Sequence, residues 1–433
     1  MPDSAAPLDA IAQAFRHIAD RVATGVDMLA QMIAVDTSFP PGTGYPEFAA
    51  LLETLVEPLG MHTRRVLVPE ALWQVPRGPA RGERTNLVAA RRSGKPVLGL
   101  YFHTDTVPPA AGWTGDPFTL ARDGDRLIGL GAADMKGDIA AVLLALRAAD
   151  ACGVTLAYDP VLLFCTDEEG GLYPGVRYLA EQGLIEGHVL NFNGTAAARI
   201  WAGCFGLFNL QVRLTGGSGH AGDASAINTI EAALPVMAAL TALKPGISSR
   251  RSALTGIDGF PLAPRIAIVA AHGGTSGGQV PAQFDILVNR RYAPEEDFTA
   301  ARAEIETAIR AAVPLGLAVE IDLVGHLAPT ADPTGPHWPR WQAALSRGFG
   351  YAPGDFRAWG ASSCSDFGWV QRATGKSEVL LTGLGRPYNN VHAPGEFTTI
   401  GDIVAMAQSV LAYLAADFAP GMLPAPDRPA VQR

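Results

Sequence analysis

The spacing of apolar residues divides the chain into alternating helices and strands. Helical spacing is expected in residues 8–33, 45–59, 136–152 and 176–182. Short apolar runs typical of buried strands lie at 97–102, 161–166 and 189–192. Strands that alternate with helices in this way indicate an α/β domain with a mostly parallel sheet.

The pattern changes after Gly206. Residues 208–214 alternate with period two, which is typical of a strand exposed on one face. Further strands are expected near 265–271 and 283–289, and helices at 226–243 and 295–312. An α/β pattern returns with helices at 338–347 and 399–416 and a strand at 379–382. We therefore expect an α/β domain made of residues 1–206 and 319–433, with an inserted α+β unit at 207–318.

Composition excludes several classes of protein. The 433 residues are 48% hydrophobic and 17% charged, which argues against disordered and fibrous chains. A formal charge of -9 makes nucleic acid an unsuitable partner. The four cysteines form no zinc-ribbon or disulfide pattern, and the first twenty residues do not resemble a signal peptide. We expect a cytoplasmic protein without a membrane partner.

Chemically active side chains follow the expected strands directly. The segments are His103-Thr-Asp105, Gly129-Leu-Gly-Ala-Ala-Asp134, Thr166-Asp-Glu168-Glu169 and Val391-His392. Open α/β sheets bind ligands at the carboxyl ends of their strands, so these side chains should meet at one edge. Imidazole and carboxylate ligands together suit Zn²⁺, Mn²⁺ or Co²⁺. Each segment alone is more often structural or merely exposed; their convergence favours a metal site.

Taken together, these four segments resemble the M20 metallopeptidase family, which includes acetylornithine deacetylase, succinyl-diaminopimelate desuccinylase, aminoacylase and glutamate carboxypeptidase. The resemblance extends from about Thr37 to the last helix. It implies a catalytic domain of the metal-dependent exopeptidase type. It also implies that the inserted unit is a lid and dimerisation domain.

The resemblance also implies a role for each residue. The metal ligands would be His103, Asp134, Glu169 and His392, with Asp134 shared between two metal positions. Glu168 would be the general base, and Asp105 would orient the imidazole of His103. The chemistry agrees, because a metal lowers the pKa of water and a carboxylate outside the ligand set can carry the proton.

Two further motifs concern the substrate. The Gly-rich segment 216–222 resembles the family's lid motif, which implies that His220 stabilises the oxyanion, within the chain or across a dimer. The alternative is a glycine-rich turn with a surface histidine. Arg291 is a candidate for holding a substrate carboxylate or, equally, an exposed arginine on a sheet. Gln279 stands where the family commonly has Asn.

Asn193 is the main departure from the family, because a Glu or Asp is usual at this position. A neutral amide is a weaker ligand for a divalent transition metal than a carboxylate is. The site built on His103, Asp134 and Asn193 should therefore be poorly occupied. We expect one tightly bound divalent metal per chain (Zn, Mn or Co), although two are possible in this family.

The expected function is metal-dependent hydrolysis of a C–N bond in a small carboxylate-bearing substrate, of the N-acyl amino acid or short-peptide type. One alternative is arylamine hydrolysis, because 5-nitroanthranilate aminohydrolase has a similar pattern. The ring would then lie among aromatic side chains: Trp201, Phe205, Trp359 and Tyr388. Another alternative is a degenerate, noncatalytic small-molecule binder, although retention of Glu168 weighs against it. The partners expected are the substrate and a second copy of the chain.

Overall fold

The computed structural model describes residues 7–76, 78–222 and 226–418, and its largest sheet has six strands. In spatial order these are β1 (His62–Leu67), β2 (Thr85–Ala90), β6 (Asp159–Cys165), β3 (Val97–His103), β7 (His188–Asn191) and β17 (Leu380–Leu381). The last four strands pair in parallel, and β1 and β2 are antiparallel at one edge. The mostly parallel sheet expected from the sequence is confirmed.

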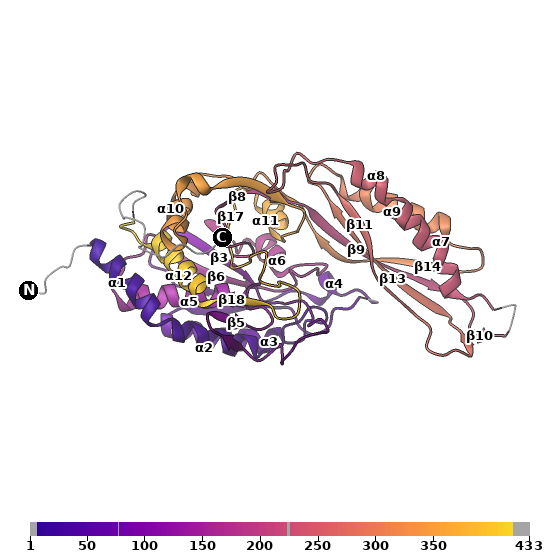
Figure 1. Cartoon of the computed structure of the whole chain (residues 1–433), viewed down its shortest axis with the longest axis horizontal. Helices are drawn as coiled ribbons and strands as arrows, with labels where there is room; N and C mark the ends of the chain where they lie inside the picture. The colour runs from indigo at the N-terminus through magenta and orange to yellow at the C-terminus, as the bar shows by residue number, and fades with distance from the viewer. Residues whose placement is uncertain (1–6, 77, 223–225, 419–433) are drawn as a thin grey trace, which may run out of the picture.

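Helices cover both faces of this sheet (Figure 1). On one face lie α1 (Pro7–Asp20), α2 (Val22–Ile33), α3 (Tyr45–Val56), α5 (Lys136–Ala151), α10 (Trp338–Phe349) and α12 (Ile400–Leu414). On the other lie α6 (Gly175–Glu181) and α11 (Phe367–Thr374). The central strands are apolar on both sides: Leu100 and Phe102 belong to one cluster, and Tyr101 and Leu163 to the other. Burial on two faces explains why these strands are continuous apolar runs in the sequence.

A second, four-stranded antiparallel sheet lies beside the first unit; we call it the distal sheet (Figure 1). Its strands, in order, are β11 (Arg265–Gly273), β13 (Gln283–Tyr292), β9 (Gly206–Thr215) and β14 (Ala318–Leu327). One face is covered by α7 (Thr229–Ala242), α8 (Lys244–Ser249) and α9 (Phe298–Ala312). This is the inserted α+β unit expected from the sequence.

The strand β14 differs from the sequence expectation. It pairs with β9 from Ala318 to Leu327, so the distal sheet continues past residue 318, where we expect the second part of the α/β domain to begin. The backbone pairing explains the difference. The apolar alternation of β14 is weak, because most of its first six residues are only partly buried at the sheet edge.

Smaller sheets and single helical turns complete the fold. One three-stranded sheet contains β15 (Thr330–Ala331), β8 (Arg199–Cys204) and β16 (Arg357–Ala361), and another contains β18 (Phe397–Thr399), β5 (Arg126–Ile128) and β4 (Ala121–Asp123). A short two-stranded ribbon pairs β10 (Gly219–His220) with β12 (Gln279–Val280). Single turns of helix are η1 (Glu57–Leu59), α4 (Glu70–Trp73) and η2 (Pro353–Asp355).

Side-chain caps explain where several helices begin. Asn228 accepts from the backbone N–H of Ile230, and α7 starts at the residue after Asn228. Asp297 caps α9 and Thr399 caps α12 in the same way. The sequence pattern predicts that α7 and α9 begin a few residues earlier, at 226 and 295. In the structure they begin directly after their capping residues, Asn228 and Asp297.

Residues 229–249, which form α7 and α8, make one stretch that is long and apolar enough to cross a membrane by length and composition alone. Core-facing helices of globular proteins have the same composition. Here Val236, Leu240 and Ile247 belong to the cluster between these helices and the distal sheet.

Candidate metal centre and substrate cavity

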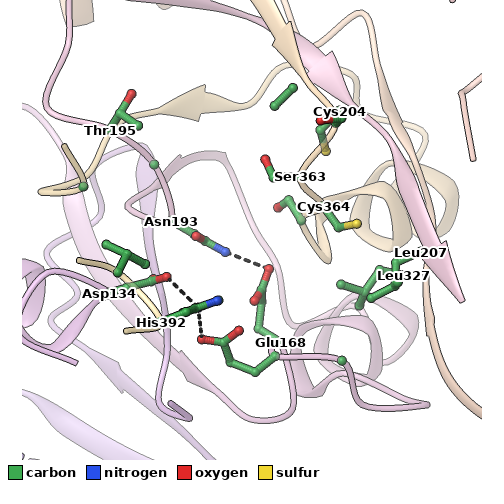
Figure 2. Close-up of a pocket in the computed structure, with 18 of the residues that line it drawn as sticks. Asp134, Glu168, Asn193, Thr195, Cys204, Leu207, Leu327, Ser363, Cys364 and His392 are labelled. Atoms are coloured by element: carbon green, nitrogen blue, oxygen red, sulfur yellow. Dashed lines mark hydrogen bonds and ion pairs between the residues drawn. The ribbon is translucent and has the colours of Figure 1, made fainter. Parts of the chain in front are cut away.

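Four segments that are distant in the sequence bring their side chains together at the carboxyl end of β3. His103 Nε2 lies 3.0 Å from Asp134 Oδ1, and Asp134 Oδ2 lies 3.4 Å from His392 Nε2. His392 Nε2 is also 2.9 Å from Glu169 Oε1. Asp134 therefore contacts both imidazoles, and Figure 2 shows its contact with His392. The ligand atoms of His103, Asp134 and Glu169 all lie within 4.8 Å of one another.

The electrostatics of this cluster suit a cation. Burial works against a charge on His103, but the hydrogen bond and charge of Asp134 outweigh it and raise the pKa of His103 well above its usual range. Desolvation of His392 is likewise outweighed by Glu169 and Asp134, which raise its pKa. Both imidazoles therefore face an excess of negative charge, which a bound cation would offset. Two imidazoles and two carboxylates form a ligand set that fits Zn²⁺, Mn²⁺ or Co²⁺.

His392 has an unusual backbone conformation. Its φ is 63°, in the left-handed region that residues other than glycine seldom adopt. Such conformations cost free energy and are concentrated at functional sites. Here the conformation accompanies an imidazole that lies against Asp134 and Glu169.

Asp105 differs from the expected arrangement. His103 Nδ1 lies 2.9 Å from the backbone carbonyl oxygen of Asp105, whereas its carboxylate oxygen Oδ1 is 3.9 Å away. The Asp105 carboxylate instead accepts a hydrogen bond from the backbone N–H of Glu169, at 2.8 Å. Burial raises the pKa of Asp105 to about 7. One residue thus contacts both the His103 imidazole and the Glu169 backbone, through different groups.

Glu168 lies next to Asn193 and is almost fully buried (Figure 2). The side-chain nitrogen of Asn193 donates a hydrogen bond of 2.7 Å to Glu168 Oε1, and its backbone N–H donates to Asn191. Burial raises the pKa of Glu168 well above its usual range; the charge of His103 lowers it, and nearby Asp366 raises it further.

Glu396 holds the loop of this centre that carries Asp134. The buried carboxylate of Glu396 accepts hydrogen bonds from the backbone N–H groups of Gly131, Ala133 and Asp134, at 2.9–3.1 Å. It therefore fixes the loop that presents Asp134. The sequence shows Glu396 only four residues beyond His392, and nothing in its spacing indicates this contact.

The loop before Glu168 is held by a buried ion pair. Arg84 Nε lies 2.9 Å from Asp167 Oδ2, and Tyr45 donates to the other carboxylate oxygen at 2.8 Å. Arg84 is fully buried and also stacks over Trp73. A buried, charged hydrogen-bond network of this kind strongly restricts the position of the loop. Neither Arg84 nor Tyr45 lies near the active-site motifs in the sequence.

A cavity of about 880 Å³ opens from the metal centre towards the distal sheet. Glu168, Glu169, Asp134, Asn193 and His392 line it at one end. Cys204, Leu207, Ser363, Cys364 and Leu327 line it on the opposite side (Figure 2). The candidate residue Arg291 is in its wall, and its Nη1 lies 2.7 Å from Cys364 Sγ.

The other two substrate candidates lie elsewhere. His220 and Gln279 are direct partners in the β10–β12 ribbon, which forms the far end of the inserted unit (Figure 1). Both side chains are exposed, and neither is in the cavity wall. Of the four aromatic residues considered for an arylamine ring, Trp201 is in the described wall of the cavity, and Phe205, Trp359 and Tyr388 are not.

Comparison with known proteins gives one family. The model of "Peptidase family M20/M25/M40" matches residues 99–416. The succinyl-diaminopimelate desuccinylase of Xanthomonas euvesicatoria pv. vesicatoria (strain 85-10) is 35% identical over 237 residues, which are 52% of this chain and 60% of that protein. The chain thus spans about 60% of the length of the curated relatives it matches first.

Solved structures are similar over almost the whole chain. The di-peptidase Dug1p of Saccharomyces cerevisiae covers 93% of this chain and 97% of its own, with a TM-score of 0.79 and 18% identity. Human carnosine dipeptidase 1 covers 93% and 98%, with a TM-score of 0.78 and 17% identity. At these identities the likeness shows a shared fold. Because the similarity covers 93% of this chain, the shared fold includes both the α/β domain and the inserted unit.

Proposed function

Since the chain belongs to peptidase family M20/M25/M40, we propose that it is a metal-dependent hydrolase of an amide C–N bond in a small carboxylate-bearing substrate. The observation that carries the proposal is the meeting of His103, Asp134, Glu169 and His392 at one end of a cavity that also contains the buried Glu168. The names of the relatives support this substrate class, because they include a desuccinylase and two dipeptidases.

Asp134, Glu169 and His392 would hold the tightly bound metal, and His103 would serve the second position, which shares Asp134. When bound, a divalent cation supplies Lewis acidity, which lowers the pKa of water and polarises an amide carbonyl. The neutral Asn193 would not complete a second strong position, since its amide oxygen carries no formal charge and its amide nitrogen donates to Glu168. We therefore propose about one tightly held cation per chain, because an amide offers weaker ligation than a carboxylate.

Glu168 would move the proton. Its Oε1 accepts a proton from the attacking water and returns it to the leaving amide nitrogen, so the same carboxyl acts first as base and then as acid. A raised pKa suits this double task near neutral pH, because the proton is then neither too weakly nor too strongly held. Asn193 would keep Oε1 in place by its hydrogen bond.

Arg291 would bind the substrate carboxylate. It lies on the face of the distal sheet that is directed into the cavity, and its side chain makes no ion pair among the described residues. A guanidinium group matches a carboxylate in shape and charge. The arylamine alternative has less support, because Trp201 is the only one of its four aromatic candidates in the described cavity wall.

A homodimer would complete the site. The β10–β12 ribbon that carries His220 is remote from the metal centre of its own chain, so His220 would act on the cavity of a second copy. Apolar side chains suitable for such an interface are exposed on α7 and β11: Ile230 (37% exposed), Leu234 (62%) and Val269 (54%). Exposed apolar patches mark association surfaces, and β11 is an edge strand of the distal sheet.

The proposal is tested by assaying protein loaded with Zn²⁺, Mn²⁺ or Co²⁺ against N-acyl amino acids, dipeptides and aminobenzoates. We expect amide hydrolysis that a chelator abolishes and metal restores. Ammonia release from an aminobenzoate without amide hydrolysis would favour the arylamine alternative. Tight substrate binding without any hydrolysis would favour a noncatalytic binder.

A further inference from the structure

Arg199 is a buried cation with no acidic partner in the part of the chain that the structure describes. It begins β8, is only 9% exposed and lines the cavity. Its Nε and Nη2 both donate to the backbone carbonyl oxygen of Trp359, at 3.2 Å, and its guanidinium group lies 5.2 Å from the Trp359 ring centroid. No carboxylate forms an ion pair with Arg199 among the residues that the structure describes. Burial lowers the pKa of Arg199 to about 10.

Other buried arginines of this chain are neutralised. The buried Arg290 has Nη2 2.6 Å from Glu296, and the half-buried Arg386, also in the cavity wall, makes a two-point ion pair with Asp402 at 2.7 Å. Burying an uncompensated charge costs several kcal/mol, which a chain tolerates when a ligand supplies the opposite charge. Arg199 has no such ion pair among the described residues, and its position in the cavity wall therefore suits the binding of an anionic group.

A separate cationic position lies on the distal sheet. Arg265 and Arg291 are direct partners on β11 and β13, so their side chains leave the same face, and both line the cavity. Like charges placed opposite each other on a sheet repel unless an anion lies between them. These two arginines belong to the distal sheet, whereas Arg199 belongs to the small sheet of β15, β8 and β16.

We infer that Arg199 binds a second acidic group of the substrate, distinct from the carboxylate held by Arg291. This inference rests on the proposed function and narrows it. The substrate is an amide with at least two acidic groups, for example an amino acid whose acyl group carries its own carboxylate. Arg199 then determines specificity, and its guanidinium touches the substrate rather than the metal centre.

The test compares two substrates of the same acyl length, N-glutaryl-L-alanine and N-valeryl-L-alanine, which differ in one carboxylate. We expect the wild-type enzyme to have the higher kcat/KM on the glutaryl substrate. Arg199→Met should lower the glutaryl-to-valeryl ratio by at least about tenfold, mainly through KM, since a charged hydrogen bond is lost. Arg199→Lys should retain part of the preference.

Arg357→Met is the matched control. Arg357 lies beside Arg199 on the neighbouring strand β16, is exposed, and donates to carbonyl groups of its own turn. This variant should leave the ratio unchanged. An unchanged ratio in Arg199→Met would overturn the inference and leave Arg199 with a structural role at the Trp359 carbonyl.

A binding measurement separates this inference from the proposed function. Glutarate should raise the melting temperature of the full-length wild-type protein and of Arg357→Met, and should raise that of Arg199→Met much less. If wild type hydrolyses neither amide, the proposed function fails, and the glutarate measurement alone decides the inference. Equal stabilisation of all three proteins would overturn it.

Discussion

Asn193 donates a hydrogen bond of 2.7 Å to Glu168, at the position where a metal-binding carboxylate is usual in the family that this chain resembles. The amide therefore contacts the proposed base. We propose that an amide in place of an acid here has two consequences: it offers weaker ligation to a metal, and it supplies a donor to a buried carboxyl group. The two consequences are tested separately below.

Glu168→Gln should keep the metal and lose turnover. The side chain is proposed to carry protons, so the loss of its charge affects the chemical step rather than the ligand set. We expect kcat to fall by roughly two orders of magnitude or more, while elemental analysis finds the wild-type metal content. Normal turnover, or loss of the metal, would show that the roles of Glu168 and Glu169 are reversed or wrong.

Asn193→Asp should increase the metal content. The new carboxylate faces Glu168, and the repulsion between them is offset when a cation binds nearby. Wild-type protein should hold about one metal equivalent after dialysis, and the variant should approach two. Asn193→Ala, which removes the donor without adding charge, should show no such gain.

Two ligand variants check the same assignment. His392→Ala should lose the tightly held metal, and His103→Ala should retain it at least in part, because Asp134, Glu169 and His392 remain. Two equivalents in dialysed wild-type protein would contradict the proposed role of Asn193, as would complete metal loss in His103→Ala.

His220→Ala should lower kcat more than it raises KM, by about 10²-fold, if the imidazole stabilises charge that develops in the transition state. Because His220 is remote from the cavity of its own chain, mixing this variant with Glu168→Gln should restore part of the activity through subunit exchange. Exchange is verified with differently labelled chains. Subunit exchange without recovered activity would exclude action across subunits. An unchanged kcat in His220→Ala would show that His220 has no catalytic role.

The buried His326 should make stability depend on pH. It stacks on Phe298 and lies 2.9 Å from the Tyr292 hydroxyl. Burial, assisted by the positive charges of Arg372 and Arg177, lowers the pKa of His326 to about 3. Between about pH 6.5 and pH 3 the unfolded chain therefore binds a proton that the folded chain does not. The free energy of unfolding falls with falling pH in this window, by up to about 1.4 kcal/mol per pH unit.

Urea titrations between pH 4 and pH 7 measure this slope. His326→Gln keeps a donor near Tyr292 but cannot titrate, so its slope should be smaller than that of wild type. The exposed His62 provides a control, since His62→Gln should leave the slope as it is. Equal slopes for all three proteins would mean that His326 is protonated in the folded state.

The sequence predicts the α/β fold and the cluster well, because both depend on strong local signals. Buried strands are continuous apolar runs, and His103, Glu168 and Glu169 follow such runs directly. Glu396 and Arg84 could not be predicted in this way. Their partners lie over 80 residues away in the chain, and a carboxylate that accepts from backbone N–H groups has no sequence signature.

Two errors of detail have physical causes. The strand β14 alternates weakly because it lies at the edge of the distal sheet, so its apolar pattern does not reveal its partner β9. At Asp105, the backbone carbonyl contacts the His103 ring, and no pattern of side chains can indicate whether a carbonyl or a carboxylate does so.

Neighbouring arginines on β13 make this strand sensitive to insertion and deletion. Arg290 is buried against Glu296, and Arg291 faces the cavity, because successive side chains leave opposite faces of a strand. A slip of one residue would turn each side chain to the opposite face of the strand. Arg290 would then leave the buried carboxylate of Glu296, and the cavity would lose the positive charge of Arg291. Changes of length during evolution should therefore be tolerated in the loops beside β13, and should be eliminated within the strand itself.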